Sequence, residues 1–446
     1  MKGREARRRI LIMGAAGRDF HNFNMVYRDD PVCDVVAFTA AQIPGIGGRI
    51  YPSALAGVLY PAGIPIVAEE GLADLVRTEH IDDVVFAYSD VAHADVMHSA
   101  SIALSSGANF VLLGPDATML SSGKPVVSVC AVRTGVGKSQ VTRWLSCYLK
   151  KKGLRVAVIR HPMPYGDLAA QAVQRFATRE DLVSEHCTVE EREEYEPHIA
   201  SGSIVFAGVD YARILTVAEQ EADVILWDGG NNDFPFVKPD LALALVDALR
   251  PEQTDTHHPG ETVLRMADIV VIAKANGAPP ENIAQLRQAV KRLAPRARVL
   301  RGGSRVTLAN SAQAKGKRAV VVEDGPTLTH GGMATGAGYV AAKATGAIIV
   351  DPRPFSVGDL AKAFDLYRHL GPVLPALGYS DAQLRDLEVT LNAADADIIV
   401  AGTPIDLAAL IKTKRPILRA TYDFEDMDEG GLAAEIDAFL VRRGLT

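Results

Sequence analysis

Short apolar stretches alternate with longer amphipathic stretches along the whole chain. The apolar stretches are rich in valine, isoleucine and leucine and are only a few residues long, which is typical of strands buried on both faces of a sheet. Their alternation with helical segments predicts an α/β fold, in which crossover helices connect the strands of parallel sheets. We expect strands at residues 10–13, 35–38, 84–88, 110–113, 126–131, 156–159, 204–206, 224–227, 241–246, 269–273, 319–323, 347–351, 397–401 and 416–421.

The first four predicted strands are followed by a segment that contains several glycines and prolines, residues 114–125. Such a segment is typical of a connection between domains, and a chain of 446 residues exceeds the length of one ordinary core. We therefore expect an N-terminal Rossmann-like α/β domain at residues 1–124 and a second domain at residues 125–446. Residues 301–446 are either an extension of that second domain or a separate subdomain.

The chain carries a formal net charge of −7 and has four cysteines without Cys-x-x-Cys spacing. A negative chain lacks the basic surface that general nucleic-acid binding needs, and no apolar run reaches the ~18 residues of a membrane span. The cysteine spacing indicates reduced thiols rather than a disulfide framework or a zinc site. The basic start precedes a short strand and not a signal-peptide core. We expect a cytoplasmic protein without nucleic-acid or membrane partners.

Residues 126–140 form the pattern of a buried strand that turns through glycines into a helix. In this arrangement backbone N–H groups face the phosphates of a nucleotide, Lys138 reaches the β and γ oxygens, and the Ser139 hydroxyl ligates Mg²⁺. A chance turn is the alternative, but the strand before the glycines and the helical spacing after them argue against it. The predicted nucleotide-binding residues here are Thr134, Gly135, Val136, Gly137, Lys138, Ser139 and Gln140.

The loop departs from the standard phosphate-binding pattern, which places a glycine where Val132 stands. From Arg133 to Ser139 it resembles the deviant loop of partitioning ATPases and dethiobiotin-synthetase-like enzymes, with Arg133 at the position of their additional lysine. The resemblance implies a P-loop NTPase core of the deviant Walker A type. It also implies that Arg133 and Lys138 are catalytic, with Arg133 contacting phosphate within the chain or across a homodimer.

Polar residues follow the two strands that we predict beside this loop. Asp228 ends the strand at residues 224–227 and, with Ser139, is the predicted Mg²⁺ ligand, because a hard cation that bridges phosphates prefers carboxylate and hydroxyl oxygen. Arg160 and His161 follow the strand at residues 156–159 and are predicted to be catalytic. The alternatives are an ordinary Asp-Gly turn at Asp228 and a proline-stiffened loop whose arginine and histidine cap local carbonyl groups.

The segment after the strand at residues 269–273 bears on the nucleotide base. It contains Lys274 and Asn276 but not the aspartate that would read guanine. Asn276 accepts a hydrogen bond without carrying charge, so a guanine preference should be weak. We predict ATP, with GTP as the alternative nucleotide, and expect Thr403 and Pro404 to frame the base from a second loop; an ordinary turn is the alternative there.

Further segments carry candidate substrate-binding residues. Arg18, His21 and Asn22 follow the first strand, and Arg49 stands beside glycines after the second. These groups suit a small phosphorylated or carboxylated substrate. Residues 323–338 concentrate glycines, hydroxyl groups and a histidine, which suits close approach of the backbone to an anion, although a flexible loop is the alternative. The acidic run at residues 188–197 indicates a solvated helix.

Taken together, five segments resemble the cyclic 2,3-diphosphoglycerate synthetase family. They are residues 14–24, 133–139, 160–167, 231–233 and 323–332. The resemblance implies a ligase that uses ATP to close 2,3-diphosphoglycerate into an intramolecular phosphoanhydride, releasing ADP and phosphate. It implies Mg²⁺, with K⁺ as a further candidate, and a homodimer. The substrate-binding residues that it adds are Asp19, Asn231, Asn232, Thr329 and His330.

The implied reaction has two steps. The γ-phosphoryl group of ATP passes to one phosphate of the small anionic substrate, and the second phosphate then expels inorganic phosphate. Two alternatives stay open at this point. One is an NTPase switch that acts on a protein partner, and the other is a dethiobiotin-synthetase-like ligase that activates a carboxylate.

Overall fold

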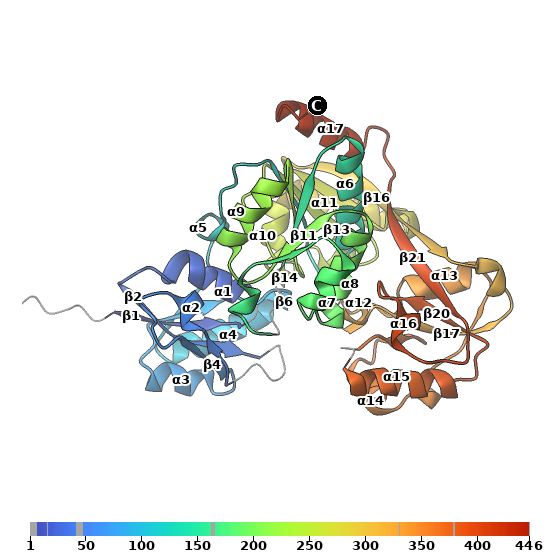
Figure 1. Ribbon diagram of the computed structural model, residues 1–446, viewed down its shortest axis with the longest axis horizontal. Coiled ribbons are helices and arrows are strands. Elements are labelled where there is room, and N and C mark those ends of the chain that lie inside the picture. The colour runs from blue at the N-terminus through green and yellow to red at the C-terminus, as the bar shows by residue number, and fades with distance from the viewer. Residues whose placement is uncertain are drawn as a thin grey trace, which may run out of the picture.

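The computed structural model describes residues 7–15, 17–41, 48–161, 166–329, 331–377 and 380–445. Figure 1 shows an N-terminal lobe in blue, a central lobe in green and yellow, and a C-terminal lobe in orange and red. Most strand pairs in the two large sheets are parallel, which confirms the predicted α/β class with parallel sheets.

The N-terminal lobe is built on a six-stranded sheet with the order β3-β4-β2-β1-β5-β7. Its strands are β1 (Arg8–Met13), β2 (Cys33–Ala40), β3 (Ile50–Tyr51), β4 (Ile64–Ala68), β5 (Asp83–Phe86) and β7 (Asn109–Val111). Its helices are α1 (Arg18–Asn22), α2 (Ser53–Ala56), α3 (Leu72–Thr78), α4 (His93–Ser105) and α5 (Pro115–Thr118). The sequence pattern missed β3 and β4, because β3 is very short and β4 contains Pro65, a residue that sheets tolerate only at special positions.

The central lobe holds one half of a 13-stranded sheet, with the P-loop strand β8 near its middle. In spatial order its strands are β10 (Gln174–Phe176), β11 (Ile204–Ala207), β9 (Val156–Arg160), β12 (Val224–Asp228), β8 (Val126–Ala131), β13 (Leu241–Asp247), β15 (Ile269–Ala273) and β16 (Arg298–Leu308). The helices around this half are α6 (Lys138–Lys151), α7 (Arg179–Ser184), α8 (Val189–Ala200), α9 (Tyr211–Glu221), α10 (Gly260–Arg265), α11 (Pro280–Leu293) and α17 (Leu432–Arg442).

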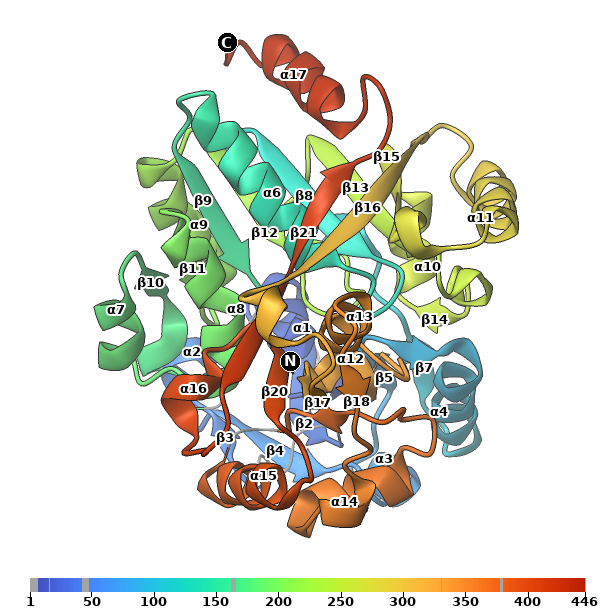
Figure 2. The ribbon, with the colours of Figure 1, turned by 90° about the vertical axis from the view of Figure 1, so that its right-hand side faces the viewer.

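The same sheet continues into the C-terminal lobe through an antiparallel pair, β16 with β21 (Ile417–Asp426), which lie side by side in Figure 2. The remaining strands are β20 (Ile398–Gly402), β17 (Arg318–Glu323), β18 (Ile348–Ile349) and β19 (Leu374–Pro375). The helices are α12 (Gly325–Thr329), α13 (Ala337–Ala344), α14 (Gly358–Leu366), α15 (Asp381–Ala393) and α16 (Leu407–Leu410). Because β16 pairs with both halves, the central and C-terminal lobes share one sheet.

A two-stranded sheet of β6 (Val91–Ala92) and β14 (His257–His258) joins the N-terminal lobe to the central lobe. Within the residues that the structure describes, no helix combines the length and the apolar composition needed to cross a bilayer.

Candidate active site

The predicted phosphate-binding loop lies between β8 and α6, which begins at Lys138. Gly135 and Gly137 have φ angles of 78° and 113°, in the left-handed region that glycine adopts without strain. A Cβ atom at Gly137 would also lie 2.9 Å from Nε2 of Gln140. Lys138 and Ser139 both line a pocket at the N-terminus of α6. This is the geometry that places backbone N–H groups and a lysine against phosphate.

Two cations, one buried and one half-buried, donate hydrogen bonds to the backbone of the loop. Arg250 donates from Nη2 to the carbonyl oxygen of Thr134 at 3.0 Å, and Lys274 donates from Nζ to the carbonyl oxygen of Gly135 at 2.7 Å. Both cations lie 2.8 Å from Oδ2 of Asp247, which is 3% exposed. Burial lowers the pKa of Lys274, while Asp247 opposes that shift. The predicted base-contacting lysine therefore holds the shape of the loop.

A pocket of about 1140 Å³ opens at the loop and takes its walls from all three lobes. Ordinary ligand pockets are roughly 300–1,000 Å³, so this one has room for a nucleotide and a second small molecule. The predicted residues that line it are Arg18, Asp19, Arg133, Thr134, Gly135, Gly137, Lys138, Ser139, Gln140, Arg160, His161, Asn231, Lys274, Asn276 and Pro404.

Other predicted site residues are described by the structure but do not line this pocket. They are Val136, Asp228, His21, Asn22, Arg49, Asn232, Thr329 and Thr403. His330 lies outside the described residues. The binding roles predicted for all of these residues stay predictions.

The formal charges of the pocket wall are balanced, although burial raises the pKa of Glu323 to about 7. Six cationic side chains line it, namely Arg18, Arg133, Lys138, Arg143, Arg160 and Lys274, against six carboxylates, namely Asp19, Asp90, Glu193, Glu194, Glu323 and Asp324. Three of the four arginines predicted to contact phosphate or substrate are already paired with acids. The pairs are Arg18–Asp233 at 2.5 Å, Arg133–Asp90 at 2.7 Å and Arg160–Asp228 at 2.7 Å.

Asp228, the predicted magnesium ligand, is fully buried and has both carboxylate oxygens engaged. Oδ2 lies 2.7 Å from Nη1 of Arg160 and 3.1 Å from Nε2 of His198, and Oδ1 accepts a hydrogen bond from Thr142 at 3.1 Å. Burial alone would raise the pKa of this carboxyl, but Arg160 and His198 hold it below its usual range. Among the described residues, no group of three or more His, Cys, Asp or Glu side chains is arranged to hold a metal. The role of Asp228 as a magnesium ligand stays a prediction.

His161 is a neutral imidazole at the pocket wall. Burial and the nearby charges of Arg18, Arg160 and Lys138 lower its pKa to about 3. Its Nδ1 has no hydrogen-bond partner among the described residues. The ring lies so close to the backbone of Gly230 that a Cβ atom there would be 2.5 Å from it. His161, which stays uncharged at neutral pH, therefore lies near Lys138.

The N-terminal residues expected to bind substrate form much of the contact between lobes. The ring of His21 stacks on Phe236 with centroids 4.0 Å apart, and its Nε2 lies 2.6 Å from the carbonyl oxygen of Thr118. His21 and Asn22 are each 2% exposed. Arg49 reaches across to donate to the carbonyl oxygen of Gly166. In this arrangement the side chains of His21 and Arg49 connect the two lobes.

The residues predicted to frame the base also have partners within the protein. Asn276 donates to the carbonyl oxygen of Ser304 at 3.0 Å and accepts from its N–H at 2.9 Å. The hydroxyl of Thr403 donates to Glu193 at 2.6 Å. Both residues therefore hold neighbouring segments of the pocket wall in place.

The acidic run at residues 188–197 is not the solvated helix that its composition indicates. It lies in α8, where Glu191 is 2% exposed, and Glu193, Glu194 and His198 line the pocket. Four further residues at the pocket or its loop are not among the predicted site residues, namely His198, Asp90, Asp247 and Arg250. For these residues, the local sequence offers one indication. Asp247 ends strand β13, which pairs in parallel with β8 and therefore ends at the same edge of the sheet as the phosphate-binding loop.

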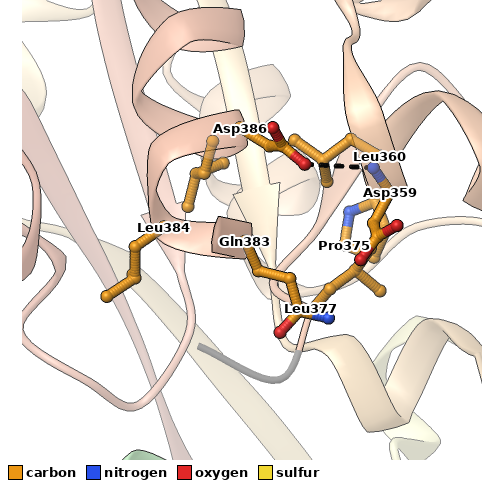
Figure 3. A pocket seen from close by; sticks show the side chains of 8 residues that line it. Asp359, Leu360, Pro375, Leu377, Gln383, Leu384 and Asp386 are labelled. Atoms are coloured by element: carbon orange, nitrogen blue, oxygen red, sulfur yellow. Dashed lines mark hydrogen bonds between the residues drawn. The ribbon is translucent and has the colours of Figure 1, made fainter. Parts of the chain in front are cut away.

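A second, small cavity of about 10 Å³ lies between α14 and α15 and shares no lining residue with the large pocket (Figure 3). Its walls include Leu360, Leu384 and Asp386, and the carboxylate of Asp386 accepts from the N–H of Asp359 at 3.1 Å. A volume of this size holds about one water molecule.

The strand β8, the glycine turn and the start of α6 beneath a large pocket define an α/β protein with a phosphate-binding P-loop. No protein-family model matches the chain. An arginine synthetase, ArcE, from Thermococcus kodakarensis is 54% identical over 424 residues, which cover 95% of this chain and 95% of that protein. The chain belongs to the ArcE family of synthetases, which are ligases.

The resemblance to cyclic 2,3-diphosphoglycerate synthetases is present but more distant. The enzyme of that name from Rubrobacter xylanophilus is 25% identical over 274 residues, covering 52% of this chain and 60% of that protein. Among solved structures, LpxK from Aquifex aeolicus in complex with ATP aligns with a TM-score of 0.42 and 14% identity, over 74% of this chain and 91% of that one. The hydrogenase maturation factor HypB from Archaeoglobus fulgidus aligns with a TM-score of 0.23 and 14% identity, over 40% of this chain and 80% of that one.

Proposed function

We propose that this chain is an ATP-dependent ligase that forms arginine by replacing a ureido oxygen with nitrogen. The observation that carries the proposal is the 54% identity, over 95% of both chains, to a protein named arginine synthetase. A synthetase couples bond formation to the cleavage of a nucleoside triphosphate. The loop that presents Lys138 and Ser139 to the pocket has the chemistry for holding that triphosphate.

The chemistry of the product suggests the substrate. Citrulline differs from arginine by a ureido oxygen in place of one guanidinium nitrogen. That oxygen leaves only after it has been activated, so the γ-phosphoryl group of ATP passes to it and ADP is released. Ammonia then attacks the same carbon, and phosphate leaves. These are the two steps expected from the sequence, phosphoryl transfer followed by displacement of phosphate, with a different acceptor and a nitrogen nucleophile.

The charge balance of the pocket supports an amino acid substrate over a bisphosphate. Arg18, Arg133 and Arg160 are each paired with a carboxylate, so they offer little net positive charge to a second polyanion beside the triphosphate. 2,3-Diphosphoglycerate carries a carboxylate and two phosphates, all anionic. Citrulline is zwitterionic and adds no net charge to the site.

Closure of 2,3-diphosphoglycerate is a second candidate, favoured by the 25% identity to a cyclic 2,3-diphosphoglycerate synthetase. The two candidates share the first step and differ in the acceptor. Comparing both acceptors in one assay therefore separates them.

The test measures ADP release by the purified protein with ATP and Mg²⁺, alone and with each acceptor. We expect turnover to require citrulline together with ammonium chloride, and arginine to form in proportion to ADP. A Lys138→Ala variant should lose at least about 100-fold of that rate, because positioned charge at the phosphates supplies several kcal/mol. Repeating the assay with GTP determines the nucleotide preference.

Other outcomes of the same assay would contradict the proposal. Turnover with 2,3-diphosphoglycerate, and a cyclic product in the phosphorus NMR spectrum, would establish the second candidate. Turnover without any acceptor would favour the NTPase switch. Stimulation by a different carboxylic acid alone would favour the carboxylate-activating ligase.

A further inference from the structure

A segment of the N-terminal lobe touches the phosphate-binding loop through the side chain of Asp90, which lies between β5 and β6. Oδ1 of Asp90 lies 2.7 Å from Nε of Arg133, and Oδ2 accepts a hydrogen bond from the N–H of Thr134 at 3.2 Å. The side chains of Asp90 and Arg133 are 8% and 9% exposed. A carboxylate of the N-terminal lobe therefore holds the first residues of the loop that presents Lys138 to the pocket.

The position of Asp90 is itself fixed by the central lobe. Its φ angle is 59°, in the left-handed region that few residues other than glycine adopt. The N–H of Asp90 donates to Oδ1 of Asn232 at 2.7 Å, and Nδ2 of Asn232 donates to the carbonyl oxygen of Val132 at 3.1 Å. Strand β6 begins at the next residue and pairs with β14, between the two lobes in Figure 1. Asp90, the buried amide of Asn232 and the start of the loop thus form one connected network.

The same segment also forms part of the pocket wall. Tyr88, Ser89 and Asp90 line the pocket just beyond the end of β5. Ligands of parallel sheets bind beyond the carboxyl ends of the strands. A molecule that rests on this wall is therefore held by the N-terminal lobe, whereas the loop that binds phosphate belongs to the central lobe.

We propose that Asp90 is a positioning residue that keeps the N-terminal lobe in register with the phosphate-binding loop. An acceptor held against Tyr88 and Ser89 is thereby aligned with the γ-phosphate of ATP. The inference rests on the proposed function, because transfer between two bound molecules requires such alignment. When the register is lost, water reaches the phosphate, and ATP gives ADP and phosphate without arginine.

The test compares the arginine formed with the ADP released, because both fall together in a protein that has only lost stability. Asp90→Gly removes the carboxylate and keeps the left-handed backbone without strain. We expect arginine formation to slow about 10- to 100-fold, since a misplacement of about 1 Å has an effect of that size. The ratio of ADP to arginine is about one in the proposed reaction and should rise to about three or more as water competes with the acceptor. The KM for ATP should stay within about threefold, because Lys138 and the glycines of the loop are unchanged.

Further variants isolate the contribution of the carboxylate. Asp90→Asn tolerates the left-handed backbone and keeps an oxygen for the N–H of Thr134, but it removes the charge opposite Arg133. Its ratio of ADP to arginine should lie between those of the unmodified protein and Asp90→Gly, and it decides the question if Asp90→Gly does not fold. In an Arg133→Met background, Asp90→Gly should have a smaller effect, because the two side chains act as a pair.

His80→Gly is the matched control for the change of backbone. His80 is an exposed residue of the same lobe, has a φ angle of 50° and does not line the pocket. The His80→Gly variant should behave as the unmodified protein in every measurement.

Each other outcome has a defined meaning. An arginine rate within about threefold of that of the unmodified protein, at an unchanged ratio, would overturn this inference and leave the proposed function intact. So would a slower rate at an unchanged ratio, which indicates a purely structural loss, or a faster rate, which indicates that the contact restrains the enzyme. If the unmodified protein formed no arginine from citrulline and ammonium chloride, the proposed function would be overturned, and this inference with it.

Discussion

The contact between the N-terminal and central lobes includes a buried ion pair between Arg18 and Asp233, and replacing Arg18 by methionine tests its contribution. Nε of Arg18 lies 2.5 Å from Oδ1 of Asp233, with the two side chains 6% and 0% exposed. The guanidinium also donates to the carbonyl oxygen of Phe234 and lies 3.8 Å from the centroid of that ring. Methionine keeps the apolar stem but leaves Asp233 buried without its cation.

The size of the effect follows from that burial. Removing one partner of a buried ion pair costs about 3–5 kcal/mol, because the other charge is left uncompensated. Removing both charges in Arg18→Met/Asp233→Leu should restore much of the loss, with a coupling energy of about 2–3 kcal/mol. Arg77→Met is the matched control. It breaks an exposed pair with Asp74 and should cost at most about 1 kcal/mol.

Urea unfolding followed by tryptophan fluorescence measures these differences. Trp227 is fully buried and packs on Phe236, the ring that His21 stacks against, so its emission reports the contact between the lobes. If the free energy of unfolding of the Arg18→Met variant lay within about 1 kcal/mol of that of the unmodified protein, the ion pair would not stabilise the contact between the lobes as expected. If that stable variant instead showed a raised KM for substrate, Arg18 would be the substrate-binding residue that the sequence predicts.

Three further predictions test other parts of the structure. Asp247→Asn removes the negative charge between Lys274 and Arg250, so the phosphate-binding loop should be held less firmly. The KM for ATP, measured in steady-state kinetics, should then rise about tenfold, which corresponds to one lost charged hydrogen bond. At Gly260 a Cβ atom would lie 2.1 Å from a backbone oxygen, so Gly260→Ala should cost about 1–3 kcal/mol in thermal unfolding, whereas Gly114→Ala, with open space around it, should not. Burial lowers the pKa of His21 to about 3 from 6.5, so the unfolded chain takes up the proton first as pH falls. Relative to His21→Phe, the unmodified protein should therefore lose about 1.4 kcal/mol of stability per pH unit below 6.5 in unfolding titrations, and parallel pH profiles would contradict this.

The local pattern of the sequence predicts elements whose cause is itself local. The strands at residues 126–131 and 269–273 match β8 and β15 because every residue in them is buried, and a continuous apolar run follows directly from that. The glycine turn before Lys138 is equally local, since only glycine adopts its φ angles without strain.

The strand β16 was missed because its cause lies elsewhere in the chain. Its middle contains Gly302 and Gly303, which resemble a loop in the sequence. In the structure a Cβ atom at position 302 would lie 2.4 Å from the ring of Phe424 on β21. The glycine is therefore required by a partner strand more than a hundred positions away, and no window of local sequence contains that partner.

Partners that are distant in the sequence also explain which roles in the site could be predicted and which could not. Asp228 is predicted because a carboxylate at the end of a buried strand is a local pattern, and its predicted role as a magnesium ligand follows from the preference of a phosphate-bridging cation for carboxylate and hydroxyl oxygen. In space it meets Arg160 and His198, 68 and 30 positions away. Arg160 lies 2.7 Å from this carboxylate and holds its pKa below the usual range. The environment of a buried acid thus depends on which cations lie within ion-pair distance of it, and the fold determines that.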